Sequence, residues 1–490
     1  MARLWKIAAV VSLAGAGCTV GPRYQRPVAP APAALKELAG NDEWKMASPG
    51  DGLMKGKWWE IFGDPELNQL EELVQVNNQN IKLAEAQYRE ARATILSNHA
   101  NYYPSIGSNS SVTQLYTRQE GSNSFSLPAS ASWEPDLWGR VRLSVEDATS
   151  SAQASVADLE NLRLSQQALL ATDYFLLAAQ DMQMEILSNT IETYDKNLQL
   201  TINRHAGGVA SRSDITLAQT QLAGAKAQFT DLHIARAEDE HAIAILTGQA
   251  PAAFSIPPTK IAAPPPPVPM GVPSQLLERR PDIASSERKV AAANAGIGLA
   301  EVAFYPTLTL SATPSLLASS LQNLFKYASR NWSAGPSLSQ TLFDFGRRGA
   351  AVENAEAAYD ATVASYRQTV LAAFQEVEDD LSQLRYLAEE SGQQHDAVVA
   401  AEDAVNLEMA RYRAGTDSFL NVITTQIIAL SDEQQAITIL ERRMSAAIDL
   451  VKALGGGWDA SSLPSQDFLR TSQAADPKNL KSPATAPVQK

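Results

Sequence analysis

The sequence is poor in the residues from which catalytic and metal-binding sites are usually built. It has one cysteine and five histidines among 490 residues. A single cysteine excludes a disulfide framework and a cysteine-rich metal site. The histidines are scattered and form no HExxH-type pair. Since no enzyme motif is present, the chain is not expected to be an enzyme or to hold a cofactor or metal ion.

Basic residues are the minority among the charged ones. There are 40 Lys and Arg against 54 Asp and Glu, which gives a formal net charge of -14. A nucleic acid is therefore not expected as a partner, because nucleic-acid binding relies on a basic surface.

The apolar run near the N-terminus is short. Residues 7–17 ("IAAVVSLAGAG") follow Arg3 and Lys6, whereas a membrane-spanning helix needs about 20 residues. A short apolar run behind basic residues is typical of a secretory signal. We therefore predict a signal peptide at residues 1–17.

The only cysteine, Cys18, comes directly after this predicted signal and follows Ala16 and Gly17. Small residues before a cysteine are typical of bacterial lipoprotein signals, although Gly15 stands where leucine is usual. The alternative is a signal that is cut elsewhere and an unmodified thiol. We expect Cys18 to be the lipidated first residue of the mature chain, and Thr19 does not favour retention at the inner membrane as aspartate would.

The chain aligns with itself at the separation of Gly139 and Gly346, which is 207 residues. The segment 204–208 ("RHAGG") then falls on 411–415 ("RYRAG"), and Gly248 falls on Gly455. Such self-similarity indicates an internal duplication. The boundaries that we predict are a signal peptide at 1–17, a lipidated N-terminal segment at 18–63, a first repeat at 64–255, a proline-rich connector at 256–274, a second repeat at 275–458 and a disordered tail at 459–490.

Each repeat is expected to contain the same elements: a helix, two polar strands, a very long helix, a glycine turn and a second helix. The expected ranges are 64–101 and 275–303 for the first helices, 105–117, 123–137, 306–317 and 331–345 for the strands, and 140–205 and 347–413 for the long helices. Some 65 helical residues extend roughly 100 Å, and their apolar residues show coiled-coil spacing. The strands alternate only roughly, which suits strands between lipid and water.

An acid, an aromatic residue and a glycine mark each expected change from strand to helix. Asp136 and Asp344 can cap the following helix, and Gly139 and Gly346 allow the backbone to turn. "DFG" also occurs in protein kinases, but the other kinase motifs are missing here. The neighbouring aromatics suit a membrane interface, or they pack a soluble junction.

Four membrane strands cannot close a barrel by themselves, and unpaired strand edges in lipid cost several kcal/mol per backbone group. Two chains would give an eight-stranded barrel, and side chains would fill its interior. Three chains would give twelve strands and room for a pore. We therefore predict a mainly α protein with some β. If its strands cross a membrane, several chains with four strands each would form the β-barrel, for example as a trimer, and the long helices would continue it as a helical barrel on one side of the membrane.

Six segments are shared with one known family: "CTVGPRYQRP", "WWEIFGDPELNQL", "ERRPDIASSERKVAAANAGIGLAEVAFYPTLTL", "DFGRR", "RYRAGTDSFLNV" and "ALGGGW". The sequence resembles the TolC/OprM family of outer-membrane efflux factors in its lipoprotein branch. The resemblance implies a homotrimer that is lipid-anchored in the outer membrane and extends into the periplasm. It also implies export of antibiotics or other small molecules with a periplasmic adaptor and an inner-membrane pump as partners. The rival interpretations are a non-channel coiled-coil lipoprotein (scaffold or adhesin) and a periplasmic enzyme.

The resemblance also places the gate at the periplasmic tip, beside the glycine turns. Relatives carry two acids where this chain has Asn421 and Thr424, which share one helix face with Leu420. Asp417 is then the nearest remaining acid.

Asp214 and Tyr412 match positions that hold the gate shut through hydrogen bonds between helices. The alternative for Asp214 is that it caps the start of a helix.

Overall fold

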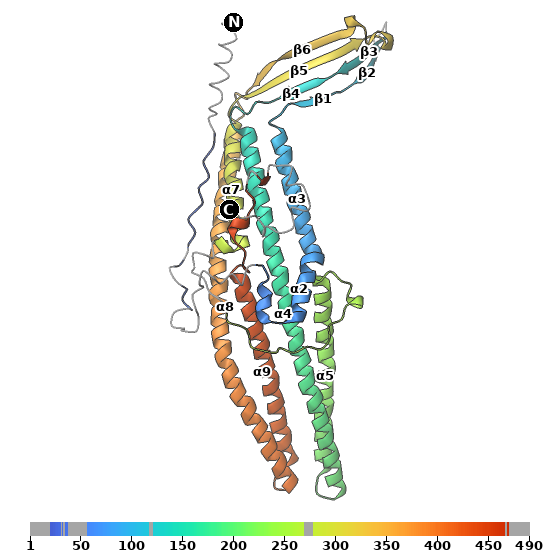
Figure 1. Cartoon of the computed structure of the whole chain (residues 1–490), viewed down its shortest axis with the longest axis vertical. Coiled ribbons are helices and arrows are strands. Elements are labelled where there is room, and N and C mark those ends of the chain that lie inside the picture. Colours follow the sequence, from blue (N-terminus) through green and yellow to red (C-terminus); the bar gives the residue numbers. More distant parts are fainter. Residues whose placement is uncertain are drawn as a thin grey trace, which may run out of the picture.

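The computed structural model describes residues 20–30, 32, 35–37, 56–116, 121–268, 278–465 and 468–469. These residues form an elongated bundle of long helices with a single β-sheet at one end (Figure 1). Cys18 and the predicted signal peptide lie outside the described residues. None of the described helices is long and apolar enough to cross a membrane.

Two helical hairpins make up most of the bundle. The first consists of α4 (Arg140–Ala206) and α5 (Arg212–Leu246), and the second of α8 (Arg347–Ala414) and α9 (Phe419–Ala453). The long helices have 67 and 68 residues and the shorter ones have 35 each. Both long helices begin one residue after their glycine, as predicted, and both hairpins turn at the end far from the sheet (Figure 1).

The predicted helix at 64–101 is two helices, α2 (Pro65–Asn77) and α3 (Gln79–Ala100). Asn78 separates them, because its side-chain oxygen accepts from the Asn80 and Ile81 N–H groups and its amide donates to the Leu246 carbonyl. A side chain that satisfies the first free N–H groups starts a new helix. The prediction of one continuous helix was therefore wrong.

The predicted first helix of the second repeat, 275–303, corresponds to α7 (Pro281–Val302). Proline fits the first turn of a helix, where its missing N–H is not needed. Helix α7 packs against both α4 and α8, and α3 packs against α4. The two hairpins are thus joined at the sheet end by α7.

Strands lie at all four predicted places, and the first two are interrupted. The first place holds β1 (Ser105–Gly107) and β2 (Ser111–Tyr116), the second β3 (Gly121–Pro128) and β4 (Ser130–Trp133), and the other two β5 (Thr307–Ala318) and β6 (Arg330–Ser339). The second and fourth end earlier than predicted, at Trp133 and Ser339 rather than at 137 and 345.

All strand pairs are antiparallel. β5 pairs with both β3 and β4 on one side and with β6 on the other, while β1 and β2 pair with β4 and β3. The sheet is therefore four strands wide, and in one chain its two outer edges, β1–β2 and β6, have no strand beside them among the described residues.

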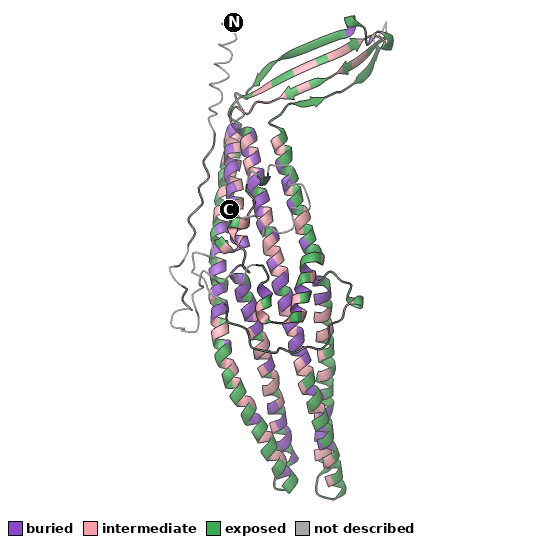
Figure 2. Cartoon of the chain, in the orientation of Figure 1, coloured by how far each residue is buried: buried purple, intermediate pink, exposed green. Residues whose placement is uncertain are grey.

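The apolar core of the bundle has two main parts. The larger cluster occupies the middle of the bundle and includes Trp58, Trp59 and Tyr174. A smaller one, the tip cluster, lies near the hairpin turns and contains Tyr194, Leu198, Ala218, Leu222, Ala225, Tyr412, Phe419, Val422 and Ile423. Figure 2 shows buried residues along the helices and mostly exposed or intermediate ones in the sheet.

The described parts of the connector and the tail pack on the bundle. Ile256, Ile261 and Val268 of the connector are buried in the larger cluster. Leu469 is 1% exposed and packs against residues of α3 and α4 that include Ile95 and Ala152. The prediction of a disordered tail was wrong for Leu469, because this apolar side chain is buried against α3 and α4.

The N-terminal segment runs along α7 and α8. The Asn294 amide donates to the Pro22 carbonyl (3.0 Å), and the Tyr24 hydroxyl donates to Glu287. Farther along, the Glu378 carboxylate accepts from the backbone N–H groups of Lys36 (2.7 Å) and Glu37 (2.9 Å). The described residues between 20 and 37 are thus tied to α7 and α8 by hydrogen bonds, and Leu35 is buried in the larger cluster.

Candidate functional site

The strand register sorts the sheet into an apolar and a polar face, and along β3, β4, β5 and β6 the apolar residues alternate with polar ones more regularly than expected. Residues on one face are linked by direct cross-strand pairs such as Trp133–Leu310–Pro336 and Ile106–Ala131–Ala312–Ala334. The apolar face carries Ile106, Val112, Phe125, Leu127, Ala131, Trp133, Leu308, Leu310, Ala312, Pro314, Leu316, Ala318, Trp332, Ala334, Pro336 and Leu338.

The opposite face is almost entirely serine, threonine and glycine. Its pairs include Ser132–Ser311–Gly335, Thr309–Ser337 and Thr313–Ser333. Exceptions such as Arg330 on the apolar face and Leu317 on the polar face lie near the far end of the sheet. A sheet with one apolar and one hydroxyl-bearing face can separate lipid from water.

The first strand-to-helix corner is held by hydrogen bonds. The Asp136 carboxylate accepts from the N–H groups of Val141 and Arg142, both at 2.9 Å. Gly139, with φ 85°, has the left-handed backbone that the turn requires. Trp138 is near Tyr305 (5.0 Å between ring centres).

The second corner is held in the same way. Its aromatic pair, Phe343 and Phe345, is more exposed than Trp138 and Tyr305 at the first corner. Asp344 accepts from the Gly346 and Arg348 N–H groups, and the Arg348 side chain (2.6 Å) holds the pKa of this carboxyl below its usual value. Gly346 has φ 91°. Phe345 is 91% exposed and has φ 54°, an uncommon conformation for a residue with a side chain.

At the hairpin turns, Asp214 and Tyr412 are not joined within one chain. Asp214 and Ser211 form a capping box: the Ser211 N–H donates to Asp214 (2.8 Å), and the Asp214 N–H donates to Ser211 (3.1 Å). The Tyr412 hydroxyl is buried and has no hydrogen-bond partner among the described residues. Within one chain the Asp214 carboxylate therefore caps the start of α5, and no hydrogen bond joins it to Tyr412.

The turn between α8 and α9 brings Asp417 and Asn421 together. The Asn421 amide donates to the Asp417 carboxylate (2.7 Å), which also accepts from the Ser418 N–H (2.7 Å) and pairs with Arg411 (3.6 Å). The bond from the Ser418 N–H lowers the pKa of Asp417 and keeps the carboxylate charged.

Leu420 and Thr424 lie on the exposed face of the first turns of α9. Leu420 is 56% exposed. The Thr424 hydroxyl donates to the Leu420 carbonyl (2.9 Å). On this face, the apolar side chain of Leu420 thus lies beside the neutral hydroxyl group of Thr424.

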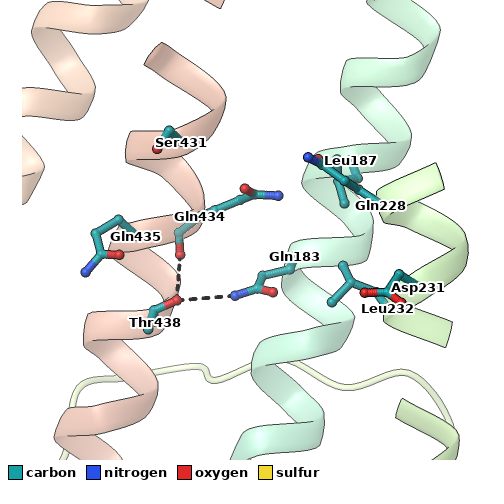
Figure 3. Close-up of a pocket in the computed structure, with 9 residues that line it drawn as sticks. All are labelled: Gln183, Leu187, Gln228, Asp231, Leu232, Ser431, Gln434, Gln435 and Thr438. Atoms are coloured by element: carbon teal, nitrogen blue, oxygen red, sulfur yellow. Dashed lines mark hydrogen bonds between the residues drawn. The ribbon is translucent and has the colours of Figure 1, made fainter. Parts of the chain in front are cut away.

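Between the two clusters, the hairpins are separated by a polar cleft of about 390 Å³ (Figure 3). The lining side chains come from α4, α5 and α9, and most are polar: Gln183, Leu187, Gln228, Asp231, Leu232, Ser431, Gln434, Gln435 and Thr438. The Gln183 amide reaches Thr438 at 3.4 Å. In the described part of the chain, no group of His, Cys, Asp and Glu side chains is arranged to hold a metal ion.

Arg204 is the tip residue that reasoning from the sequence missed. Its guanidinium lies over the Tyr412 ring, 4.5 Å from the ring centre. The signal that could have identified it is its alignment with Arg411 in the self-comparison, since the two arginines hold equivalent places before the two glycine turns.

The sequence matches the outer membrane efflux protein family over residues 70–249 and 272–456. The probable efflux pump outer membrane protein TtgC of Pseudomonas putida is 30% identical over 92% of this chain and 95% of its own length. The pyoverdine export outer membrane protein OpmQ of Pseudomonas aeruginosa is 29% identical over 86% of this chain and 92% of its own. The structure of the outer-membrane channel OprN superposes with a TM-score of 0.83 at 30% identity, covering 90% of this chain and all of OprN.

Proposed function

Since the chain belongs to the outer membrane efflux protein family, we propose that three copies of it form the outer-membrane channel of a tripartite efflux system. The family is one of transport proteins, not of enzymes. In this arrangement the channel extends from the outer membrane into the periplasm, where an adaptor and an inner-membrane pump deliver the substrate.

The sorted faces of the sheet are the observation that carries this proposal. A scaffold or adhesin in water would gain nothing from sixteen apolar positions on one exposed face. With this face toward lipid, the serine and threonine face lines an aqueous passage. β5, with 12 residues, is long enough to cross a bilayer when tilted by about 45°.

The open edges of the sheet support a trimer. β6 of one chain and β1–β2 of the next would pair, so that no backbone group is left unpaired in lipid. Twelve strands would close the barrel, and the two hairpins of each chain would continue it as a helical barrel. The equal hairpin lengths favour two structural repeats with the boundaries predicted above.

Conductance decides between a channel and a non-channel lipoprotein. The full-length protein, purified in detergent, should run as a heat-resistant trimer and give discrete conductance steps in planar bilayers. A protein that remains monomeric in detergent and gives no conductance would contradict the proposal and favour the scaffold.

The names of the relatives support a proposal for the substrate class. TtgC is named for a probable efflux pump and OpmQ for pyoverdine export. We infer that this chain also exports small organic molecules, antibiotics among them. Deletion of the gene should lower the minimal inhibitory concentration of such compounds, and the full chain should restore it.

The lipid anchor at Cys18 remains a proposal with indirect support. A Cβ on Gly21 would lie 2.7 Å from the Gly298 backbone, so Gly21 lies against the last third of α7, whose C-terminal end leads into β5. Three residues span at most about 10 Å. A lipid on Cys18 would therefore reach the membrane beside the sheet.

We expect wild-type protein to incorporate labelled palmitate and Cys18→Ser to incorporate none. The variant should still form trimers, because the strands insert without the anchor. Equal labelling of the two proteins would contradict lipidation at Cys18.

We also propose that Leu420, Asn421 and Thr424, with Asp417, line the narrow periplasmic end of the channel. Thr424→Asp would add three carboxylates to this ring, and one unit charge at 4 Å contributes about 1 kcal/mol even in water. The half-blocking concentration of a divalent cation should fall by about tenfold or more, as measured by conductance. Thr424→Ser is the neutral control. No change in block with Thr424→Asp would place the constriction elsewhere.

A further inference from the structure

Arg204 crosses from the first hairpin to the second at the tip of the chain. Its guanidinium carbon lies 4.5 Å from the centre of the Tyr412 ring, and its Nη1 donates to the Arg413 carbonyl (3.2 Å). A Cβ on Gly415 would lie 4.0 Å from its Nη2. A single side chain of α4 thus contacts both the last turn of α8 and the glycine turn after it.

Tyr412 offers this arginine a ring face rather than a hydroxyl. The side chain is 4% exposed, and its ring packs on Phe419 at 5.1 Å between centres. No carboxylate of the described residues lies within ion-pair distance of Arg204. Within one chain, the charge of Arg204 is therefore met by the aromatic face of Tyr412 and by the Arg413 carbonyl.

The counterpart arginine behaves differently. Arg411 pairs with Glu408 (2.9 Å) and Asp417 (3.6 Å), both in its own hairpin. Only the arginine of the first hairpin reaches across, so the two equivalent positions have different contacts.

Because of the polar cleft, the contact of Arg204 with the second hairpin is important for the relative position of the two tip turns. Around the cleft, α4 and α5 are joined to α9 by two long side-chain hydrogen bonds, Gln183 to Thr438 and Gln221 to Gln426, each of 3.4 Å. The tip cluster is thereby separated from the larger cluster, and the relative position of the two turns depends on contacts at the tip itself.

We propose that Arg204 is a positioning residue which holds the two tip turns of each chain together through the ring of Tyr412, and thereby stabilises the closed channel. The proposal rests on the proposed channel function. It assigns the role to the tyrosine ring and not to the tyrosine hydroxyl.

Single-channel recording tests this assignment. Arg204→Ala should raise the open probability by about threefold to thirtyfold, the range that one cation–π contact allows. Tyr412→Leu should act likewise, whereas Tyr412→Phe should leave the open probability unchanged. Arg413→Ala removes a charge from the same turn and should also have no effect, because only its backbone carbonyl is used. A Tyr412→Phe channel as leaky as Tyr412→Leu would overturn the proposal.

A distance measurement tests the contact without relying on conductance. Val209→Cys and Ala414→Cys, in a Cys18→Ser background, place one spin label on each turn, and labelled chains are diluted with unlabelled ones. Arg204→Ala should broaden the distance distribution between the labels, and Arg413→Ala should not. An unchanged distribution with Arg204→Ala overturns the proposal. If the wild type does not conduct but Arg204→Ala broadens the distribution, the channel function fails while the contact stands.

Discussion

Ala334→Arg should abolish assembly in the outer membrane, whereas Ser333→Arg should be tolerated. Ala334 lies near the middle of β6, opposite Ala312 on the apolar face, and Ser333 lies opposite Thr313 on the polar face. An arginine facing lipid at the bilayer midplane costs about 2 to 4 kcal/mol, and a trimer carries three of them. An arginine on the polar face remains in water.

The measurement is the fraction of each variant that runs as a heat-resistant trimer from outer-membrane preparations. The two positions are adjacent on one strand, so a general defect of the strand would affect both alike. Equal loss for both variants, or greater loss for Ser333→Arg, would contradict the assignment of the faces.

The same register assigns Leu310 and Leu338 to a face of the sheet. Leu310 lies opposite Pro336 and Leu338 lies opposite Leu308, which places both on the apolar face. Leu338 is one residue from the end of β6, where the cost of a charge falls toward the interface.

Gly455→Ala should strongly destabilise the fold, because Gly455 follows the end of α9 and lies against the residues before α7. Its φ is 91°, and an added Cβ would lie 2.0 Å from the Arg279 carbonyl oxygen. A positive φ alone costs alanine about 1 to 2 kcal/mol. The clash is with backbone and would also displace Arg280, which donates to the Ala453 carbonyl (3.1 Å). We expect a total loss of more than about 4 kcal/mol.

Gly392→Ala is the matched control. Gly392 is exposed within α8 and an added Cβ would meet no other atom within 4 Å, so alanine should stabilise the helix by about 0.5 to 1 kcal/mol. The melting temperature of the detergent-solubilised protein, followed by circular dichroism, measures both effects. A Gly455→Ala variant that melts close to the wild type would show that α7 can move away from the α9 terminus at little cost.

The sequence by itself determined the order of the elements and the fold class. Both long helices were predicted to within about one residue at each end, because a glycine precedes each and a glycine follows each. A positive φ at Gly139, Gly346 and Gly415 is a local requirement of the backbone, and a local requirement can be recognised from local residues.

Only the tertiary structure decided which residues meet across elements. Alternation along one strand does not say which residue of the next strand lies opposite, so only the pairing register showed that the apolar residues of all the strands share one face of the sheet. Likewise, the sequence indicated Asp214 as the partner of the Tyr412 hydroxyl, whereas only the fold brought the Arg204 guanidinium over the Tyr412 ring within one chain. Asp214 has a partner three residues away, whereas the contact of Arg204 depends on how two hairpins 207 residues apart are packed.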